Sequence, residues 1–326
     1  MTRLPGEWEL HEATWITWPC RLSVWQDYKA ACQAYADVIN TIAPCEKVYL
    51  IVNLEHLELA RKMCTAQVTF VTTFSADDSW SRDTSPIFLI SDGKLVSTCW
   101  KFNAWGEKFS PYDRDAQLSQ HISTYLGTES IHLSMVLEGG SVHSNGQGTL
   151  LSTKECLLNS NRNPHLTQQD IEEQLKHTLH ADNIIWLNRG LDGDVDTDGH
   201  IDNTACFADA NTIMIQSCDD PQDPNFAYFQ ENKQILSQTS FALHEIPQPP
   251  RIYSEGARVP LSYINFYFAN DIIVFPTFNA KKTDDHALQL FKDIFPQRTI
   301  MPVHALPIVH GGGGIHCITM QQPKIK

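Results

Sequence analysis

The sequence has few basic residues and no long apolar run. Lysine plus arginine number 24 against 38 aspartate plus glutamate, which gives a formal net charge of −14. A nucleic-acid-binding face needs a basic footprint, so this balance argues against nucleic acid as a partner. Acidic surfaces are common for solubility, although a negative field also attracts cationic small ligands. No apolar run reaches 18 residues, so we expect no transmembrane helix and no membrane partner.

The sequence also lacks a disulfide framework. Its nine cysteines are odd in number and irregularly spaced, and none belongs to a Cys-x-x-Cys pair. Small secreted domains have dense and usually even sets of cysteines, so we expect reduced thiols in a cytoplasmic protein. The first residues show neither the charged start nor the apolar stretch of a secretory signal. With 42% hydrophobic and 19% charged residues, the composition is that of a globular protein.

What recurs along the chain is a hairpin turn. Turns are expected at Asp92-Gly93, Asn145-Gly146, Asp209-Ala210-Asn211 and Asn270-Asp271, about 50 to 65 residues apart. The length alone favours about two domains. The regular spacing instead predicts repeated units in one domain over residues 1–326, and the alternative is an α+β protein whose spacing is accidental.

The last unit is expected to be split between the two ends of the chain. Residues 315–320 would form a strand that pairs with Ala13–Trp18 and leaves no free sheet edge. Apolar spacing predicts helices over 23–43, with Ser23 as N-cap, over Thr167–His180, capped by Thr167 and Asp170, and over 284–295.

Polar residues fall at equivalent places, at or just before each hairpin. They are Asp83, Glu138, His200 with Asp202, and Cys317. In a ring of repeats these positions would converge on the central axis and form one site. Cys317 follows four glycines, which let the backbone approach a ligand closely. A cysteine with a distant histidine and an acid is a pattern of nucleophilic catalysis, and the alternative is a buried structural thiol.

The other candidates favour proton transfer and binding of a cation. Alternation along a strand would place His200 and Asp202 on one face, where an imidazole could move protons. His-x-Asp is a weak metal signature, so we predict no metal ion. Inward carboxylates such as Asp83 and Glu138 are costly unless paired, and a guanidinium would pair them, although turn acids are common. Trp80 could provide an aromatic wall or could belong to the core.

Together these motifs resemble the agmatine deiminases (agmatine iminohydrolases), a family of guanidine-modifying enzymes related to peptidylarginine and arginine deiminases. The resemblance runs along nearly the whole chain, over Trp8–Pro19, Asp77–Asp83, Asn103–Gly106, Leu137–Ser141, Asn161–Leu166, Asp196–Asp202 and Gly311–Gln322. It implies an α/β fold, a five-bladed pseudo-symmetric α/β propeller (pentein) of ββαβ-type units with a central active site. One departure is Gly314, where the family commonly has Asn.

The resemblance also implies a role for each candidate residue. Cys317 matches the nucleophile, His200 the general acid/base, and Glu138 the acid that orients the histidine. Asp83 and Asp202 match the acids that grip the guanidinium. Trp80 and Asp196 are expected at the substrate, with Asp196 for its distal amine.

The expected reaction is hydrolysis of agmatine to N-carbamoylputrescine and ammonia through a cysteine thiouronium intermediate, in putrescine biosynthesis. It needs no cofactor, and a homodimer is an expectation from the family. The alternatives are a deiminase for free or peptidyl arginine, a metal-dependent hydrolase, and a non-catalytic propeller that binds amines.

Overall fold

The structure is a computed structural model that describes residues 2–64 and 67–325. Five sheets in these residues share one order of elements. Two strands pair antiparallel, a helix follows the second strand, and a third strand then pairs parallel to that second strand. A parallel partner requires such a crossover, because a tight turn can join only antiparallel strands. The repeat predicted from the hairpin spacing is therefore present as a repeat of strand pairing, and the spacing is not accidental.

Each of the five sheets has three or four strands. The first sheet has the order β19 (Thr319–Pro323), β2 (His11–Thr17), β3 (Lys47–Ile51) and β4 (Val68–Val71). The second is β1 (Thr2–Arg3), β5 (Ile87–Ser91), β6 (Lys94–Lys101) and β7 (Glu129–Val136). The others are β8 (Val142–Ser144), β9 (Thr149–Thr153) and β10 (Asn183–Leu187); β11 (Ala205–Asp209), β12 (Thr212–Ser217) and β13 (Ala242–Pro247); and β16 (Tyr267–Ala269), β17 (Ile272–Thr277) and β18 (Thr299–His304). A small hairpin is formed by β14 (Tyr253–Ser254) and β15 (Ala257–Arg258).

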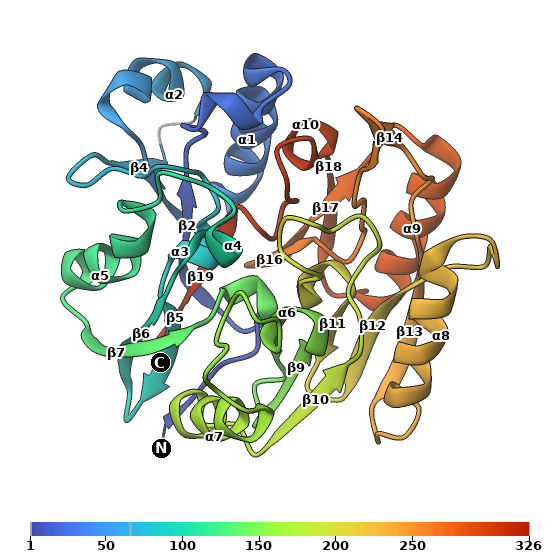
Figure 1. Cartoon of the computed structure of the whole chain (residues 1–326). Coiled ribbons are helices and arrows are strands. Elements are labelled where there is room, and N and C mark those ends of the chain that lie inside the picture. The colour runs from blue at the N-terminus through green and yellow to red at the C-terminus, as the bar shows by residue number, and fades with distance from the viewer. Residues whose placement is uncertain (1, 65–66, 326) are drawn as a thin grey trace.

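The longer helices are the crossovers of the five sheets. They are α1 (Tyr28–Ile42), α5 (Asp115–Leu126), α7 (Gln168–Leu179), α8 (Pro224–Leu236) and α9 (Lys281–Ile294). The shorter helices are η1 (Leu22–Val24), η2 (Leu54–His56), α2 (Leu57–Met63), α3 (Ser81–Thr84), α4 (Ala104–Glu107), η3 (Gly139–Ser141), α6 (Lys154–Leu157), η4 (Ile201–Asn203) and α10 (Leu306–Val309). Figure 1 shows the five crossover helices on the outside of the molecule, while α3 and β19 lie near its middle.

The two ends of the chain meet in one sheet, as expected. β19 pairs antiparallel with β2, with Thr319 opposite Ile16. The strand begins at Thr319, later than the predicted residue 315, because the preceding residues form a turn. In this turn the amide of Ile318 donates to the carbonyl of Gly314, at 3.3 Å, and that of Thr319 donates to His316, at 3.1 Å.

Local signals predicted one helix start correctly and another wrongly. Thr167 and Asp170 form the expected capping box at the start of α7. The helix predicted from residue 23 begins only at Tyr28, because Asp27 is its N-cap and accepts a hydrogen bond from the amide of Ala30. Ser23, the predicted cap, lies in the separate short helix η1.

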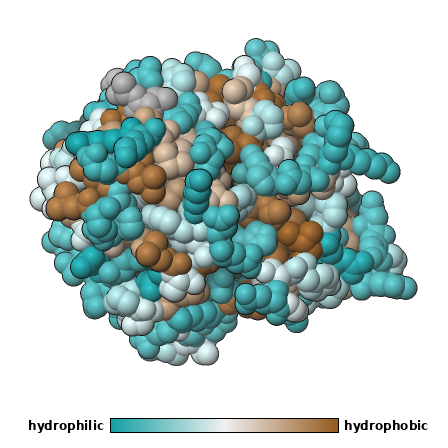
Figure 2. Space-filling view, turned by 90° about the horizontal axis from the view of Figure 1, so that it is seen from above, coloured by the Kyte–Doolittle hydropathy of each residue, from teal (hydrophilic) through white to brown (hydrophobic). Residues whose placement is uncertain are grey.

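The surface is mixed in polarity, and the core lies between the sheets and helices. Figure 2 shows hydrophilic residues over most of one face, with smaller brown patches between them. The largest fully buried side chains include Trp15, Trp18, Tyr35 and Tyr263. Among residues 2–64 and 67–325, no helix combines the length and the apolar character needed to cross a membrane.

Candidate active site

The predicted site residues lie at equivalent points of the repeat. Asp83 is in α3, directly before β5, and Glu138 directly precedes η3 and β8. His200 and Asp202 lie at η4, before β11, and Cys317 lies two residues before β19. The prediction that alternation along a strand aligns His200 with Asp202 is wrong, because these residues form a 3₁₀ turn. The turn nevertheless directs both side chains into the site.

Three of these side chains converge on Gly140. A Cβ atom placed on this glycine would lie 2.6 Å from Nδ1 of His200, 2.9 Å from Oδ2 of Asp202 and 3.1 Å from Oδ1 of Asp83. The amide of Gly140 also donates to Oδ1 of Asp83, at 2.9 Å. A glycine is needed here because any side chain would enter the space in which the three polar groups meet.

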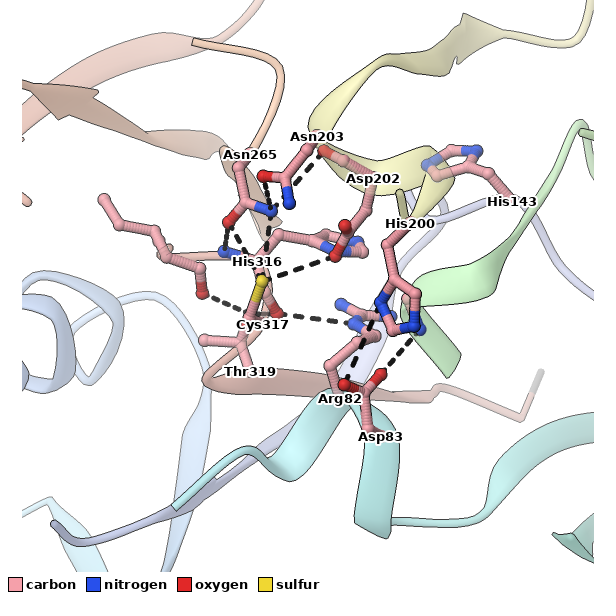
Figure 3. Close-up of polar contacts among 12 residues, drawn as sticks. Arg82, Asp83, His143, His200, Asp202, Asn203, Asn265, His316, Cys317 and Thr319 are labelled. Atoms are coloured by element: carbon pink, nitrogen blue, oxygen red, sulfur yellow. Dashed lines mark hydrogen bonds and ion pairs between the residues drawn. The ribbon is translucent and has the colours of Figure 1, made fainter. Parts of the chain in front are cut away.

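Cys317 lies beside the same carboxylates (Figure 3). Its Sγ is 3.5 Å from Oδ2 of Asp202 and 3.2 Å from Nδ2 of Asn265. Burial and the negative charges of Asp202 and Asp83 raise the pKa of the Cys317 thiol well above its ordinary value. The thiol is therefore protonated at neutral pH, and a bound cation would remove part of the electrostatic cost of forming the thiolate.

His200 is buried between two acidic groups. Its Nδ1 is 4.0 Å from Oδ2 of Asp83, and its Nε2 is 3.9 Å from Oε2 of Glu138. Burial by itself would lower the pKa of His200. The nearby negative charges outweigh burial, Asp83 most strongly, and raise the pKa of His200 well above its ordinary value. The imidazole is thus a cation at neutral pH, which is the form that can donate a proton.

Two further residues hold these acids in place. Arg162 donates from Nε to Oε1 of Glu138, at 2.6 Å, and both side chains are fully buried. Trp105 donates from its indole nitrogen to Oδ2 of Asp83, at 2.9 Å. These contacts leave Oε2 of Glu138 and Nε2 of His200 without hydrogen-bond partners, although both atoms are buried. Unpaired buried polar atoms are uncommon in folded proteins, and a catalytic role is one explanation for them.

A pocket leads from the surface to this cluster. Its lining includes Trp80, Asp83, Asp196 and Cys317, together with Trp105. The predicted substrate residues Trp80 and Asp196 thus line the same pocket as the predicted nucleophile. Burial, followed by the nearby Asp194, raises the pKa of Asp196. His200, Asp202 and Glu138 lie behind the lining, each at most 2% exposed.

Next to the site, Arg82 and His316 connect it to a buried acid from the N-terminal segment. His316 bridges Oδ2 of Asp202, at 2.9 Å, and the Glu7 carboxylate, at 3.0 Å. Arg82 donates to the same carboxylate, at 3.1 Å. Burial by itself would raise the pKa of Asp202. The hydrogen bond from His316, with weaker charge effects, outweighs burial and lowers the pKa below its ordinary value. Asp202 is therefore held as a carboxylate.

Within residues 2–64 and 67–325, two groups of side chains have the donor atoms of a metal site within 4.8 Å of one another. They are Glu7 with His143 and His316, and Glu138 with Cys156 and His200. In each group an arginine is bonded to the carboxylate, Arg82 in the first and Arg162 in the second. A guanidinium already neutralises the charge that would attract a metal ion, so both groups are better suited to hydrogen bonding than to metal binding.

Several of these residues were not singled out from the sequence. Arg162 and Trp105 lie in two of the stretches that carry the resemblance, but nothing in their spacing shows that they bond Glu138 and Asp83. Asn265 offered a clearer signal. It lies just before β16, the place in its repeat that Asp83, Glu138 and Cys317 hold in theirs.

Comparison with known proteins shows the family to which the chain belongs. The model of the Porphyromonas-type peptidyl-arginine deiminase family matches residues 3–323. The chain belongs to this family. A family relative from Legionella pneumophila, provisionally named an agmatine deiminase, is 43% identical and covers 98% of this chain and 94% of its own. The agmatine deiminase of Pseudomonas aeruginosa is 38% identical, over 98% of this chain and 95% of its own.

Solved structures show that the α/β fold is shared with this family. The agmatine deiminase of Enterococcus faecalis has a TM-score of 0.94 and 30% identity, and the match covers 100% of this chain and 96% of that one. A cysteine-to-serine variant of the C. jejuni agmatine deiminase, with substrate bound, has a TM-score of 0.92 and 30% identity, over 99% and 97% of the two chains.

Proposed function

We propose that this protein is an agmatine deiminase, which hydrolyses agmatine to N-carbamoylputrescine and ammonia. The observation that carries the proposal is the meeting of an imidazolium and two carboxylates at Gly140, with the Cys317 thiol beside Asp202, in and behind a pocket with a further acid. Its relatives named for this activity support it over the whole length of the chain.

The substrate would fill the pocket as a dication. Its planar guanidinium would lie between Asp83 and Asp202, which can pair with it through parallel hydrogen bonds. Trp80 and Trp105 would flank the ligand, and aromatic faces attract such cations. The distal amine would pair with Asp196. This pairing would also offset the cost of burying that acid.

Agmatine fits the pocket better than arginine does. Arginine carries an α-carboxylate, which would need a positive partner near Asp196. The described residues that line the pocket include no lysine or arginine. Lys108 lies beside Asp196, but its Nζ is bonded to the carbonyls of Val195 and Asp196 and to the carboxylate of Asp198.

The chemistry would proceed in two halves. Once the cation is bound, the Cys317 thiol passes its proton to water, and Sγ attacks the guanidinium carbon. His200 donates its proton to the leaving nitrogen, the carbon–nitrogen bond breaks, and ammonia leaves a positively charged thiouronium on Sγ. Neutral His200 then takes a proton from water as the water oxygen attacks the same carbon.

The second half restores the enzyme. The carbon–sulfur bond breaks, the thiolate leaves, and the protonated ureido product loses its proton to Sγ. His200 keeps the proton taken from water and is again an imidazolium. The proton that the thiol lost at the start leaves with ammonia as ammonium, so protons and charge balance. In this scheme Glu138, held by Arg162, orients His200, and no metal ion or cofactor takes part.

The remaining parts of the proposal concern the whole protein. We propose that the five repeated sheets are the blades of one catalytic propeller domain over residues 1–326. Residues 1, 65, 66 and 326 of this range lie outside the described residues. The enzyme would act in the cytoplasm, in putrescine biosynthesis, and as a homodimer. Sedimentation of the purified protein tests the last point.

One assay tests the function. The protein is incubated with agmatine, free arginine or an arginyl peptide, with and without EDTA, and ammonia and the ureido product are measured. We expect turnover of agmatine alone, unchanged by EDTA. Turnover of arginine but not agmatine would favour an arginine deiminase, and loss of activity with EDTA would favour a metal-dependent hydrolase. Turnover of none of the three would leave a non-catalytic amine-binding protein.

A further inference from the structure

Asn265 is a buried residue that has no part in the chemistry proposed above. It is 2% exposed and lies just before β16. The repeat that contains β16 contributes no group to that reaction. Figure 3 shows its side chain directed at Cys317, with His200 and Asp83 farther away. The five repeats therefore place six polar side chains in one site, and Asn265 is the member that does not titrate.

The hydrogen bonds of Asn265 determine which way its amide points. Oδ1 accepts from the backbone amide of His316, at 2.9 Å. Nδ2 faces Oδ1 of Asn203, at 3.1 Å, and Sγ of Cys317, at 3.2 Å. An amide nitrogen has two hydrogens, so one is available for each of these acceptors.

The opposite orientation of the amide is unfavourable. A flip would place the carboxamide oxygen of Asn265 against the oxygen of Asn203. It would also place the NH₂ group against the amide of His316, donor against donor. Two contacts would be lost at a buried site, which is costly for each buried group. The N–H of Asn265 is thus fixed toward the sulfur.

The glycine before the catalytic segment makes room for this contact. A Cβ atom on Gly314 would overlap Oδ1 of Asn265 and would lie 2.8 Å from its Cγ. Any side chain at position 314 would push the amide away from Cys317 or displace the chain. This position is also the one at which the sequence departs from the family pattern, so in this protein Asn265 and Gly314 are matched in shape.

The charges around the sulfur explain why a neutral donor is useful there. Asp202 and Asp83 both oppose the thiolate, and His316 is bonded to Asp202 and to Glu7 rather than to the sulfur. A hydrogen bond to an anion is stronger than one to a neutral thiol, so the contact favours the reactive form. We propose that Asn265 is a catalytic residue that donates a hydrogen bond to the Cys317 thiolate and holds Sγ at the guanidinium carbon.

The proposal rests on the proposed function, but it can be tested without substrate. Iodoacetamide reacts with thiolates, so the rate of alkylation at Cys317 against pH reports how readily the thiolate forms. The modified peptide is quantified by mass spectrometry, because eight other cysteines are present. The variants are Asn265→Ala, which removes the donor, and Asn265→Asp, which keeps the shape and adds a negative charge. The matched control is Asn232→Asp, because Asn232 is also buried but bonds only the backbone near Asn188.

We expect the alkylation rate at pH 8 to fall about 10-fold in Asn265→Ala and further in Asn265→Asp, with the profile displaced to higher pH. Agmatine turnover should show kcat lower by roughly 10- to 100-fold with KM within about threefold. Asn232→Asp should change neither the profile nor kcat. Thermal unfolding confirms that each variant is folded, and Asn265→Ser replaces any that is not.

Two results would overturn the proposal. One is an alkylation profile of folded Asn265→Ala or Asn265→Ser that coincides with that of the parent. The other is a lower melting temperature with unchanged kcat, which would assign Asn265 a purely structural role. Failure of the parent to turn over agmatine would instead contradict the proposed function, and the alkylation profiles would still decide the role of Asn265.

Discussion

Replacing Gly140 with alanine is a sharp test of the active-site geometry. The added Cβ atom would lie 2.6 Å from Nδ1 of His200, whereas ordinary contacts begin at 3.4 Å. The imidazole must therefore move by roughly 0.8 Å, and Asp202 and Asp83 must move by smaller amounts. A displacement of about 1 Å in a catalytic group costs on the order of 10²-fold in rate. We expect kcat/KM for agmatine to fall by about that factor.

The assay is steady-state release of ammonia, with urea unfolding to check that the variant is folded. Gly93→Ala is the matched control, since Gly93 lies in the β5–β6 turn with no atom within 4 Å of an added Cβ. Its φ of 74° makes alanine unfavourable by about 1 kcal/mol, so stability should fall while kcat/KM stays the same. If folded Gly140→Ala kept kcat/KM within threefold of the parent, the convergence of the three side chains would not be what positions the substrate.

Three further predictions concern single side chains. Cys317→Ala should remove agmatine turnover by at least about 10³-fold while the protein stays folded, and full activity would exclude the thiol mechanism. Asp196→Asn should raise KM for agmatine about 10-fold with little change in kcat, because one ionic contact is lost, whereas Asp209→Asn in a surface turn should leave KM unchanged. A shared rise in KM would argue for a general charge effect. Burial raises the pKa of Asp115 to about 8, so the folded state keeps a proton between about pH 4 and 8 that the unfolded chain loses. The urea midpoint should therefore fall from pH 5 to pH 8, and by less in Asp115→Asn; equal falls would refute this assignment.

Part of the fold follows from short-range chemistry and could be predicted. The turn at Asp92-Gly93 and the capping box of Thr167 with Asp170 form within a few residues, so local sequence specifies them. The start of α1 was missed because two cap residues compete there, and only Asp27 places its oxygen near a free helical amide. Ser23 and Asp27 are both suitable N-caps by residue type, and the structure shows that the helix begins after Asp27.

The same limit applies to the site. The spacing of the hairpins indicated that Asp83, Glu138 and Cys317 would meet, because equivalent positions of a repeat face the same centre. Spacing could not show that Arg162 binds Glu138, or that His200 and Asp202 share a 3₁₀ turn and not a strand. Arg162 and Glu138 lie 24 residues apart in one repeat, and the distance between them depends on how the segment before α7 folds back on β8.

The sequence by itself therefore determined the kind of chemistry, through residue types that only a few reactions need and through the family to which they belong. Only the tertiary structure decided the protonation states of the site residues. The thiol of Cys317 is held protonated and His200 charged because burial removes water and brings carboxylates within 4 Å. Neither protonation state can be predicted from the sequence alone, because the residues that interact are more than 100 positions apart in the chain.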